Sequence, residues 1–271
     1  MSVAAESIRN ALEANPLREP PFRSVIQSLG LPPTSRGLEA GCGLGLQARL
    51  LADAAGSPGR ITGLDILLEL LAYGLENVNR GGYSDRLEFF QGDVSSLPFA
   101  DDSFDWAWSA DCIGYPASET TPILEQLIRV VKPGGSIVIL GWSSQQQLPG
   151  YPLLEARLNA TCSSYIPFLS DVIPGLNFMR SSRSFRAASL EDVSVQTFVG
   201  DVHAPLSSGE RLALLSLFQM LWGTPQEGVS PQDWKEYQRL CEPESPDLIL
   251  VLPEYYAFFT YSMFRGKVPL V

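Results

Sequence analysis

The sequence has a single histidine, His203, and four widely spaced cysteines with no CxxC pair. One histidine excludes a metal site built on two histidines, and a Ser-His-Asp triad would have to use this residue. The separated cysteines exclude a zinc ribbon or a CxxC redox dithiol, and they favour reduced thiols over a disulfide framework. Most metal and histidine chemistry is therefore excluded, and we expect no bound metal.

Positive charge is also scarce, with 19 Lys and Arg against 30 Asp and Glu and a formal net charge of −11. Such a surface repels phosphate backbones and anionic membranes, so we expect neither a nucleic-acid nor a membrane partner. No apolar run reaches the roughly 18 residues of a membrane span, and residues 1–21 hold no signal-peptide core. These absences favour a cytoplasmic protein.

What is present is a chain of 271 residues, 45% of them hydrophobic, which is long enough to bury a sizeable core. From residue 22 to 142, strand and helix patterns alternate. The patterns predict helices at 22–30, 46–55, 66–79 and 119–131, and strands at 37–40, 60–65, 86–91, 104–109 and 136–142. This alternation predicts an α/β fold with a doubly wound, mostly parallel sheet.

The pattern changes after Trp142, because residues 145–189 show no strand pattern and hold a helical stretch at 151–164. We expect this segment to be an inserted helical cap. The remaining elements are strands at 192–204 and 256–268 and helices at 207–222 and 231–241. One seven-stranded sheet then accounts for a single domain over 1–271, in which residues 190–271 complete the sheet begun by 22–142.

The segment GLEAGCGLG (37–45) is a strand that runs into a glycine loop at the start of a helix, where a ligand can touch the backbone. Its spacing is GxGxG, whereas most dinucleotide folds have GxGxxG. Glu39 at the strand end would oppose a pyrophosphate but suits an ammonium or sulfonium group. The motif therefore favours a cationic ligand without phosphate, and a tight turn without any ligand is the alternative.

Two further carboxylates follow strand ends. Asp65 closes the second strand, 20 residues after Gly45, where a carboxylate can accept hydrogen bonds from both ribose hydroxyls. Asp93 follows the third strand in QGDV (91–94), where it could accept the adenine amino group while the Val94 N–H donates to the ring. A simple turn before Leu97 is the alternative role for Asp93.

In this order, GLEAGCGLG (37–45), GLD (63–65), QGDVSSLPFADDSFDWAWSAD (91–111) and LIRVVKPGG (127–135) resemble the class I S-adenosylmethionine-dependent methyltransferases. The resemblance covers residues 22–142 and implies a Rossmann-like methyltransferase fold with S-adenosyl-L-methionine as cofactor. It also implies that the loop 109–114 lies beside the sulfonium. The cofactor-binding residues implied are Glu39, Gly41, Gly43, Gly45, Asp65, Ile66, Asp93, Val94 and Ser109.

Within that group the sequence is most similar to the ubiquinone/menaquinone-type methyltransferases, which implies a small organic acceptor, apolar or aromatic. It departs from their pattern at two places. DILLELL (65–71) replaces the frequent DxSxxML, and SADCIGY (109–115) lacks the histidine of many relatives. The methylated atom, whether O, N or C, cannot be read from the sequence.

A general base is needed only if the acceptor loses a proton. The candidates are Asp111, Tyr115, Glu119 and His203. Each also has a structural interpretation, as a loop cap, a pocket wall, an acid in the first turn of a helix and a strand-end residue respectively. The acceptor pocket is expected to include Tyr115, Trp142, Tyr151 and Phe168, although aromatic residues at helical spacing often belong to the core.

Three other functions remain to be weighed. A protein methyltransferase and a cofactor-binding domain without activity share this fold, but the intact acids at 39, 65 and 93 argue against lost activity. A nicotinamide-dependent dehydrogenase is disfavoured by the GxGxG spacing, by Asp93 and by KPGG (132–135).

Overall fold

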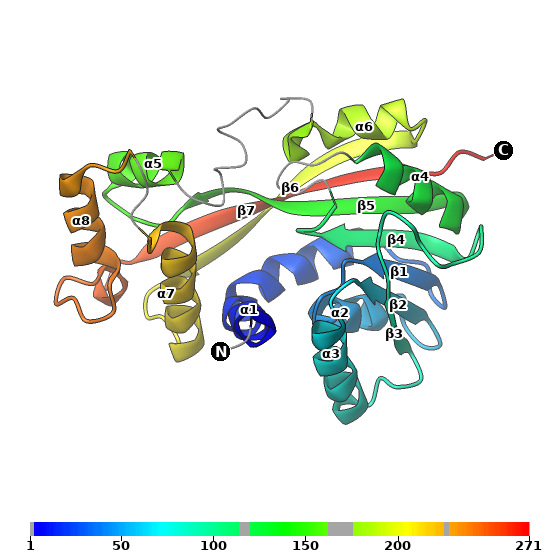
Figure 1. Ribbon diagram of the computed structural model, residues 1–271, viewed down its shortest axis with the longest axis horizontal. Helices are drawn as coiled ribbons and strands as arrows, with labels where there is room; N and C mark the ends of the chain where they lie inside the picture. Colours follow the sequence, from blue (N-terminus) through cyan, green and yellow to red (C-terminus); the bar gives the residue numbers. More distant parts are fainter. Residues whose placement is uncertain (1–2, 114–119, 162–175, 225–227, 271) are drawn as a thin grey trace. The chain divides into compact units, whose positions relative to one another are not determined.

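The computed structural model describes residues 3–113, 120–161, 176–224 and 228–270 (Figure 1). The chain divides into two compact units. The first, which we call the sheet unit, comprises Phe22–Trp142, Ile173–Phe198 and Ser262–Val271. The second, which we call the helical unit, comprises Met1–Pro21, Ser143–Val172 and Val199–Tyr261. The divisions fall within α1 and within three strands, β5, β6 and β7.

Seven strands form one sheet in the order β3-β2-β1-β4-β5-β7-β6, which confirms the predicted strand number (Figure 1). Pairing is parallel from β3 through β2, β1 and β4 to β5. Since β1 has β2 on one side and β4 on the other, the winding reverses at β1, and ligands bind beyond the carboxyl ends of strands at such a point. The strands are β1 (Arg36–Ala40), β2 (Arg60–Asp65), β3 (Leu87–Gln91), β4 (Phe104–Ala110), β5 (Val131–Gln146), β6 (Glu191–His203) and β7 (Tyr256–Lys267).

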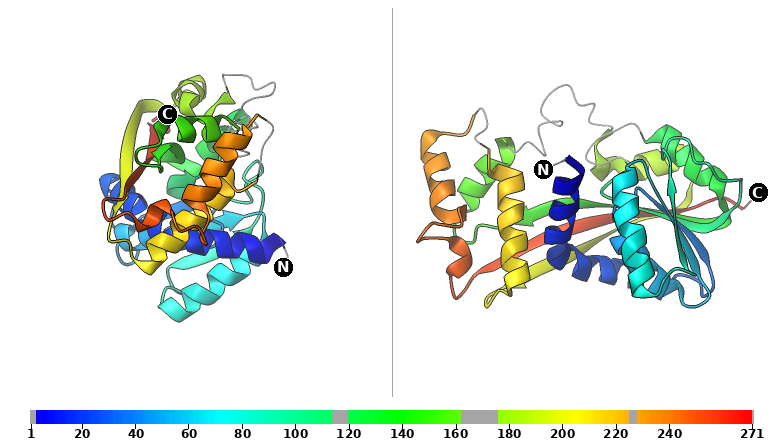
Figure 2. Two further views of the ribbon diagram at one scale, coloured as in Figure 1. Left: turned by 90° about the vertical axis from the view of Figure 1, so that its left-hand side faces the viewer. Right: turned by 60° about the horizontal axis from the view of Figure 1, so that its bottom comes forward.

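The helices of the sheet unit bury one apolar face each. In α2 the buried residues are Ala48, Leu51, Ala52 and Ala55, a helical period, and α2 and α3 both contact β2 and β3 (Figure 2). The helices of both units together are α1 (Val3–Ser28), α2 (Leu46–Ala55), α3 (Leu68–Gly81), α4 (Thr121–Val130), α5 (Pro152–Thr161), α6 (Ser181–Ala187), α7 (Ser208–Trp222) and α8 (Pro231–Cys241), with short 3-10 turns at Phe178–Arg180 and Ile249–Val251.

The core of the sheet unit joins strand residues such as Leu38 and Ile139 to Phe185 and Phe264. Phe178 belongs to the same core and packs edge-to-face on Phe264, with ring centroids 5.1 Å apart. An aromatic residue from the predicted cap is thus a core residue, which was the structural interpretation offered for such residues.

The helical unit is held together by α7, α8 and α5. Helix α7 begins with a capping box in which Ser207 and Glu210 bond each other's backbone N–H. Trp222 stacks on Phe218 at 5.7 Å and meets the edge of Tyr237 from α8 at 6.5 Å. None of the described helices is long and apolar enough to cross a membrane.

The prediction for the first helix was too short. A helix was expected only at 22–30, but α1 begins at Val3 and includes Pro16, Pro20 and Pro21. Each proline removes one backbone hydrogen bond, which is why the sequence indicated a break there. Burial of Leu17 and Phe22 supplies packing that the prolines do not prevent.

Helix α4 ends at Val130, just before KPGG, as predicted, but the predicted start of the following strand at residue 136 was wrong. Strand β5 begins at Val131, directly after α4. Phe104 pairs with Val131 and Trp106 with Ser136, so two steps along β4 face five along β5. Residues 132–135 therefore form a bulge within β5.

The predicted cap at 145–189 is divided between the two units. Its first part, with α5, belongs to the helical unit, and its last part, with α6, belongs to the sheet unit. Its role as a cap stays a prediction.

Candidate functional site

The glycine loop is anchored to the end of β2. The N–H groups of Gly41 and Cys42 both donate to the carbonyl of Leu64, at 2.8 and 3.0 Å, and the Gly45 N–H donates to the Cys42 carbonyl at 2.8 Å. These bonds hold the loop at the carboxyl edge of the parallel strands, directly before α2.

The three loop glycines differ in the space beside them. A Cβ at Gly41 would lie 2.3 Å from the Cys112 sulfur, and a Cβ at Gly45 would lie 2.4 Å from the ring of Phe89. A Cβ at Gly43 would meet nothing within 4 Å, although its φ of +53° still disfavours other residues. Gly43 is therefore the loop position at which a ligand can approach the backbone.

Asp65 lies next to Gly43. Its Oδ2 accepts the Gly43 N–H at 2.8 Å and its Oδ1 accepts the Leu67 N–H at 3.0 Å. Each carboxylate oxygen retains a second lone pair for a ligand hydroxyl. The following residue, Ile66, is 60% exposed and offers an apolar surface beside this carboxylate.

Glu39, at the end of β1, is 1% exposed, and both of its carboxylate oxygens lack a hydrogen-bond partner in the described structure. Burial, and secondly the charge of Asp65, raises the pKa of Glu39 well above its ordinary value. An ionised carboxylate without a partner is costly in such a place. A cationic group of a ligand would supply the missing partner.

Asp93 and Val94 lie in a turn after β3. The Asp93 carboxylate accepts the Ser95 N–H at 2.8 Å, and the backbone carbonyl of Asp93 accepts the Ser96 N–H at 3.0 Å. These bonds to Ser95 lower the pKa of Asp93, which is exposed. The turn offered as an alternative is present, and the contact with adenine stays a prediction.

The loop after β4 is organised by two of the predicted residues. The buried Ser109 hydroxyl accepts the Ile113 N–H at 3.4 Å. Asp111, at a φ of +50°, accepts the Trp142 N–H at 3.0 Å and donates its own N–H to the Leu140 carbonyl at 2.9 Å. Asp111 thus ties this loop to β5, as its interpretation as a loop cap predicts.

Sequence reasoning missed Cys112, whose sulfur occupies the space beside Gly41. The only available signal was its place in the loop after the fourth strand. Burial, with Asp65 and Asp111, raises the pKa of Cys112 to about 11, and burial raises the pKa of Cys42 too. Both thiols are therefore protonated at neutral pH and act as packing groups.

The residues predicted for the acceptor pocket and for proton transfer fall in different parts of the chain. Tyr115, Glu119 and Phe168 lie outside the described residues. Trp142 belongs to the sheet unit, whereas Tyr151 and His203 belong to the helical unit. His203 is exposed at the end of β6, with Nδ1 3.2 Å from the Ala204 carbonyl oxygen.

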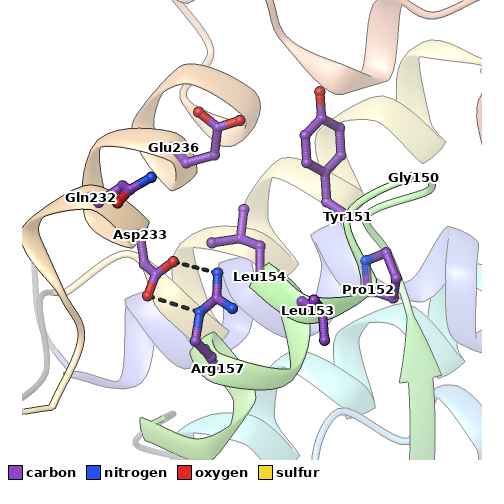
Figure 3. Close-up of a pocket in the computed structure, with 9 residues that line it drawn as sticks. All are labelled: Gly150, Tyr151, Pro152, Leu153, Leu154, Arg157, Gln232, Asp233 and Glu236. Atoms are coloured by element: carbon purple, nitrogen blue, oxygen red, sulfur yellow. Dashed lines mark hydrogen bonds and ion pairs between the residues drawn. The ribbon is translucent and has the colours of Figure 1, made fainter.

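Tyr151 lines a pocket of about 530 Å³ in the helical unit (Figure 3). Arg157 of α5 makes a two-pronged ion pair with Asp233 of α8, at 2.9 and 2.7 Å. Figure 3 shows Tyr151 and the acidic residues of α8 on opposite sides, with leucines of α5 between them. The lining residues are Gly150, Tyr151, Pro152, Leu153, Leu154, Arg157, Gln232, Asp233 and Glu236.

Comparison with known proteins identifies the family. A family profile described as a methyltransferase domain matches residues 38–135. A demethylmenaquinone methyltransferase from Bacillus velezensis is 31% identical over 197 residues, which cover 66% of this chain and 81% of the relative. The chain belongs to the class I S-adenosylmethionine-dependent methyltransferases. The predicted enzyme class and cofactor are thereby confirmed.

Two solved structures share the fold of this methyltransferase. The YcgJ protein from Bacillus subtilis has a TM-score of 0.57 and 17% identity, and the match covers 93% of this chain and all of that one. A Haemonchus contortus phosphoethanolamine N-methyltransferase, solved with S-adenosyl-L-methionine, has a TM-score of 0.54 and 18% identity, covering 92% of this chain and 52% of that one.

The residues present fit the cofactor of this family. The partnerless carboxylate of Glu39 suits its ammonium group, Gly43 leaves room for it at the backbone, and the Asp65 carboxylate has acceptor capacity for ribose hydroxyls. All three residues belong to the sheet unit, so that unit carries the residues expected to hold the cofactor.

Proposed function

We propose that this methyltransferase transfers the methyl group of S-adenosylmethionine to a small organic acceptor with an apolar or aromatic body. The observation that carries the donor side is the arrangement of Glu39, Gly43 and Asp65 at the switch point of the sheet. The name of the Bacillus velezensis relative, a demethylmenaquinone methyltransferase, supports a small apolar acceptor.

S-adenosylmethionine supplies a methyl group on a positively charged sulfur, which an acceptor displaces in line. The residues of the chain therefore bind, orient and exclude water rather than form bonds. In this proposal Glu39 holds the ammonium group, Asp65 the ribose, and Asp93 with Val94 the adenine. Ser109 near the end of β4, and the loop that follows this strand, lie beside the methyl group.

The chain needs no general base for an acceptor that is already ionised. Asp111 is engaged with the Trp142 N–H, so its carboxylate holds the loop in place. We therefore assign Asp111 a structural role. Tyr115 and His203 remain candidates for an acceptor that must lose a proton.

For the acceptor, we propose that the pocket around Tyr151 receives its apolar part. The pocket lining combines Leu153 and Leu154 with polar side chains, of which Arg157 and Asp233 form an ion pair. The leucines can contact an apolar body, and the polar side chains can bond a polar group on that body.

In the first experiment, calorimetry measures the binding of S-adenosylmethionine and, separately, of NADH to the purified protein. Binding of the first alone is expected, and binding of NADH alone would contradict the donor assignment. The second experiment offers S-adenosylmethionine with a labelled methyl group together with hydroxyquinones, phenols, amines or a lysine-containing peptide. Label should move from S-adenosylmethionine to a methylated small-molecule product that is separated from it by chromatography, with S-adenosylhomocysteine as the by-product. Label confined to the peptide would indicate a protein methyltransferase instead.

A further inference from the structure

Phe89 of β3 occupies a space left by glycines on three other elements. A Cβ at Gly45, at the start of α2, would lie 2.4 Å from the ring, and a Cβ at Gly63 of β2 would lie 2.6 Å from it. A Cβ at Gly74 of α3 would lie 3.4 Å from the same ring. The first two distances are too short for any carbon atom, so the ring can sit there only because residues 45 and 63 are glycines.

The ring contacts both chain segments that carry the cofactor residues. Gly45 follows Gly43 by two residues, and Gly63 precedes Asp65 by two residues. The hydrogen bond of 2.8 Å from the Gly43 N–H to the Asp65 carboxylate joins the same two segments. Phe89 and this hydrogen bond therefore hold the loop and the strand end from two points.

We infer that Phe89 is a positioning residue of the cofactor site. Its ring sets the separation between the glycine loop and the end of β2, and so keeps the Gly43 backbone and the Asp65 carboxylate in the geometry that binds the cofactor. Gly63 and Gly45 thus leave room for this ring, although Gly45 also has a left-handed φ of +66° that favours glycine. At Gly43, by contrast, the open space beside the backbone faces no side chain within 4 Å.

The neighbouring residue supplies a matched control. Phe90 has the same side chain on the other face of the strand, is 41% exposed, and packs edge-to-face on Phe99 with centroids 5.5 Å apart. No loop glycine has the Phe90 ring among its close contacts. Phe90 is more exposed than Phe89, so its truncation controls for the loss of an aromatic ring from β3, and only Phe89 contacts the cofactor loop.

The first test measures the affinity for S-adenosylhomocysteine of Phe89→Ala, Phe89→Leu and Phe90→Ala, at a temperature where circular dichroism shows each variant folded. We expect Phe89→Ala to raise Kd by about tenfold or more, because small displacements of binding groups have large effects. Phe89→Leu should recover part of that loss, and Phe90→Ala should stay within about twofold of the wild type. Equal effects at 89 and 90, or an unchanged Kd for Phe89→Ala, would overturn the inference.

Hydrogen exchange gives a readout that general destabilisation would not produce. In cofactor-free Phe89→Ala, amide exchange should accelerate at 41–45 and 65–67 while the amides of β4 and β5 keep their protection. Uniform acceleration across the sheet would show that Phe89 acts only through overall stability.

The second test is a double-variant cycle with Gly63→Ala. The added methyl group conflicts with the Phe89 ring and also approaches the Cys42 sulfur, at 2.9 Å. Only the first conflict is relieved in a Phe89→Ala background, which lacks the ring atoms beyond Cβ, so the loss of cofactor affinity caused by Gly63→Ala should be smaller there by about threefold or more. Additive effects would overturn the inference. If Gly63→Ala alone does not fold, the Phe89 and Phe90 variants decide the question by themselves.

Discussion

Gly43→Val tests the cofactor loop most directly, because two physical effects act at this position. The φ of +53° places Gly43 in the left-handed region, and the space beside its Cα is open within 4 Å. Valine there is strained by its branched Cβ, and its methyl groups fill the space through which the ligand reaches the backbone. We expect the variant to fold and to lose cofactor binding.

The strain has a magnitude that can be estimated. A residue other than glycine in an unfavourable backbone region costs about 1–3 kcal/mol. For a chain of this size each kcal/mol lowers Tm by about 2–4 °C, so Gly43→Val should lower Tm by roughly 2–12 °C. This loss says nothing about the ligand, and a control with the same strain is therefore needed.

Gly82→Val is that control. Gly82 ends α3 with a φ of +76°, and a Cβ there would also meet nothing within 4 Å. Both variants should lose a similar amount of thermal stability, while calorimetry with S-adenosylhomocysteine should show lost binding only for Gly43→Val. The reasoning is refuted if Gly43→Val binds normally, or if Gly82→Val loses binding to the same degree.

Three further variants test the other residues. Asp65→Ala should weaken cofactor binding by about 1.5–3 kcal/mol, the scale for hydrogen bonds to a charged group, and unchanged affinity in calorimetry would remove Asp65 from the ribose role. Glu39→Gln should weaken cofactor binding but raise the Tm of the cofactor-free protein at pH 8. Because the pKa of Glu39 is raised in the folded protein, its contribution to the stability of the wild type falls as pH increases above about 4.5. The gain in Tm of Glu39→Gln should therefore be small at pH 4. A Tm below that of the wild type at pH 8 would contradict this reasoning. Tyr151→Ala should weaken the binding free energy of the acceptor by up to about 1.5–3 kcal/mol, which raises KM, while cofactor affinity stays unchanged. A lower Tm with normal kinetics would instead make Tyr151 a core residue.

Much of the sheet could be predicted because buried strands and amphipathic helices leave periodic patterns. The predicted strand at 60–65 and helix at 231–241 coincide with β2 and α8. The KPGG bulge could not be predicted, because it depends on how β5 pairs with β4. The start of α1 was missed because Pro16, Pro20 and Pro21 disfavour a helix locally, whereas the packing of the rest of the helix keeps this segment helical.

The site shows the same division between local and non-local information. Gly43 and Asp65 could be placed together because the carboxyl ends of adjacent parallel strands meet at one edge of the sheet. Phe89 and Cys112 could not be placed there, since a phenylalanine in an apolar strand and a cysteine in a loop carry no pattern that names their partners. Their contacts with Gly45 and Gly41 exist only in the folded chain. The division into two units could not be predicted either, because its boundaries fall within strands, where the sequence pattern does not change.

Glu39 connects the stability of the protein to its function. Among the described residues the buried Glu39 carboxyl has no hydrogen-bond partner, and burial together with the charge of Asp65 raises its pKa, so ionising it lowers the stability of the cofactor-free protein. Replacing it with an apolar residue would relieve this strain, and it would also remove the group that can neutralise the cofactor's positive charge. In this proposal that free energy is recovered when the cation binds, because the carboxylate then gains a partner that the described residues do not provide. The unfavourable burial of Glu39 in the chain alone therefore indicates that its ligand carries a positive charge.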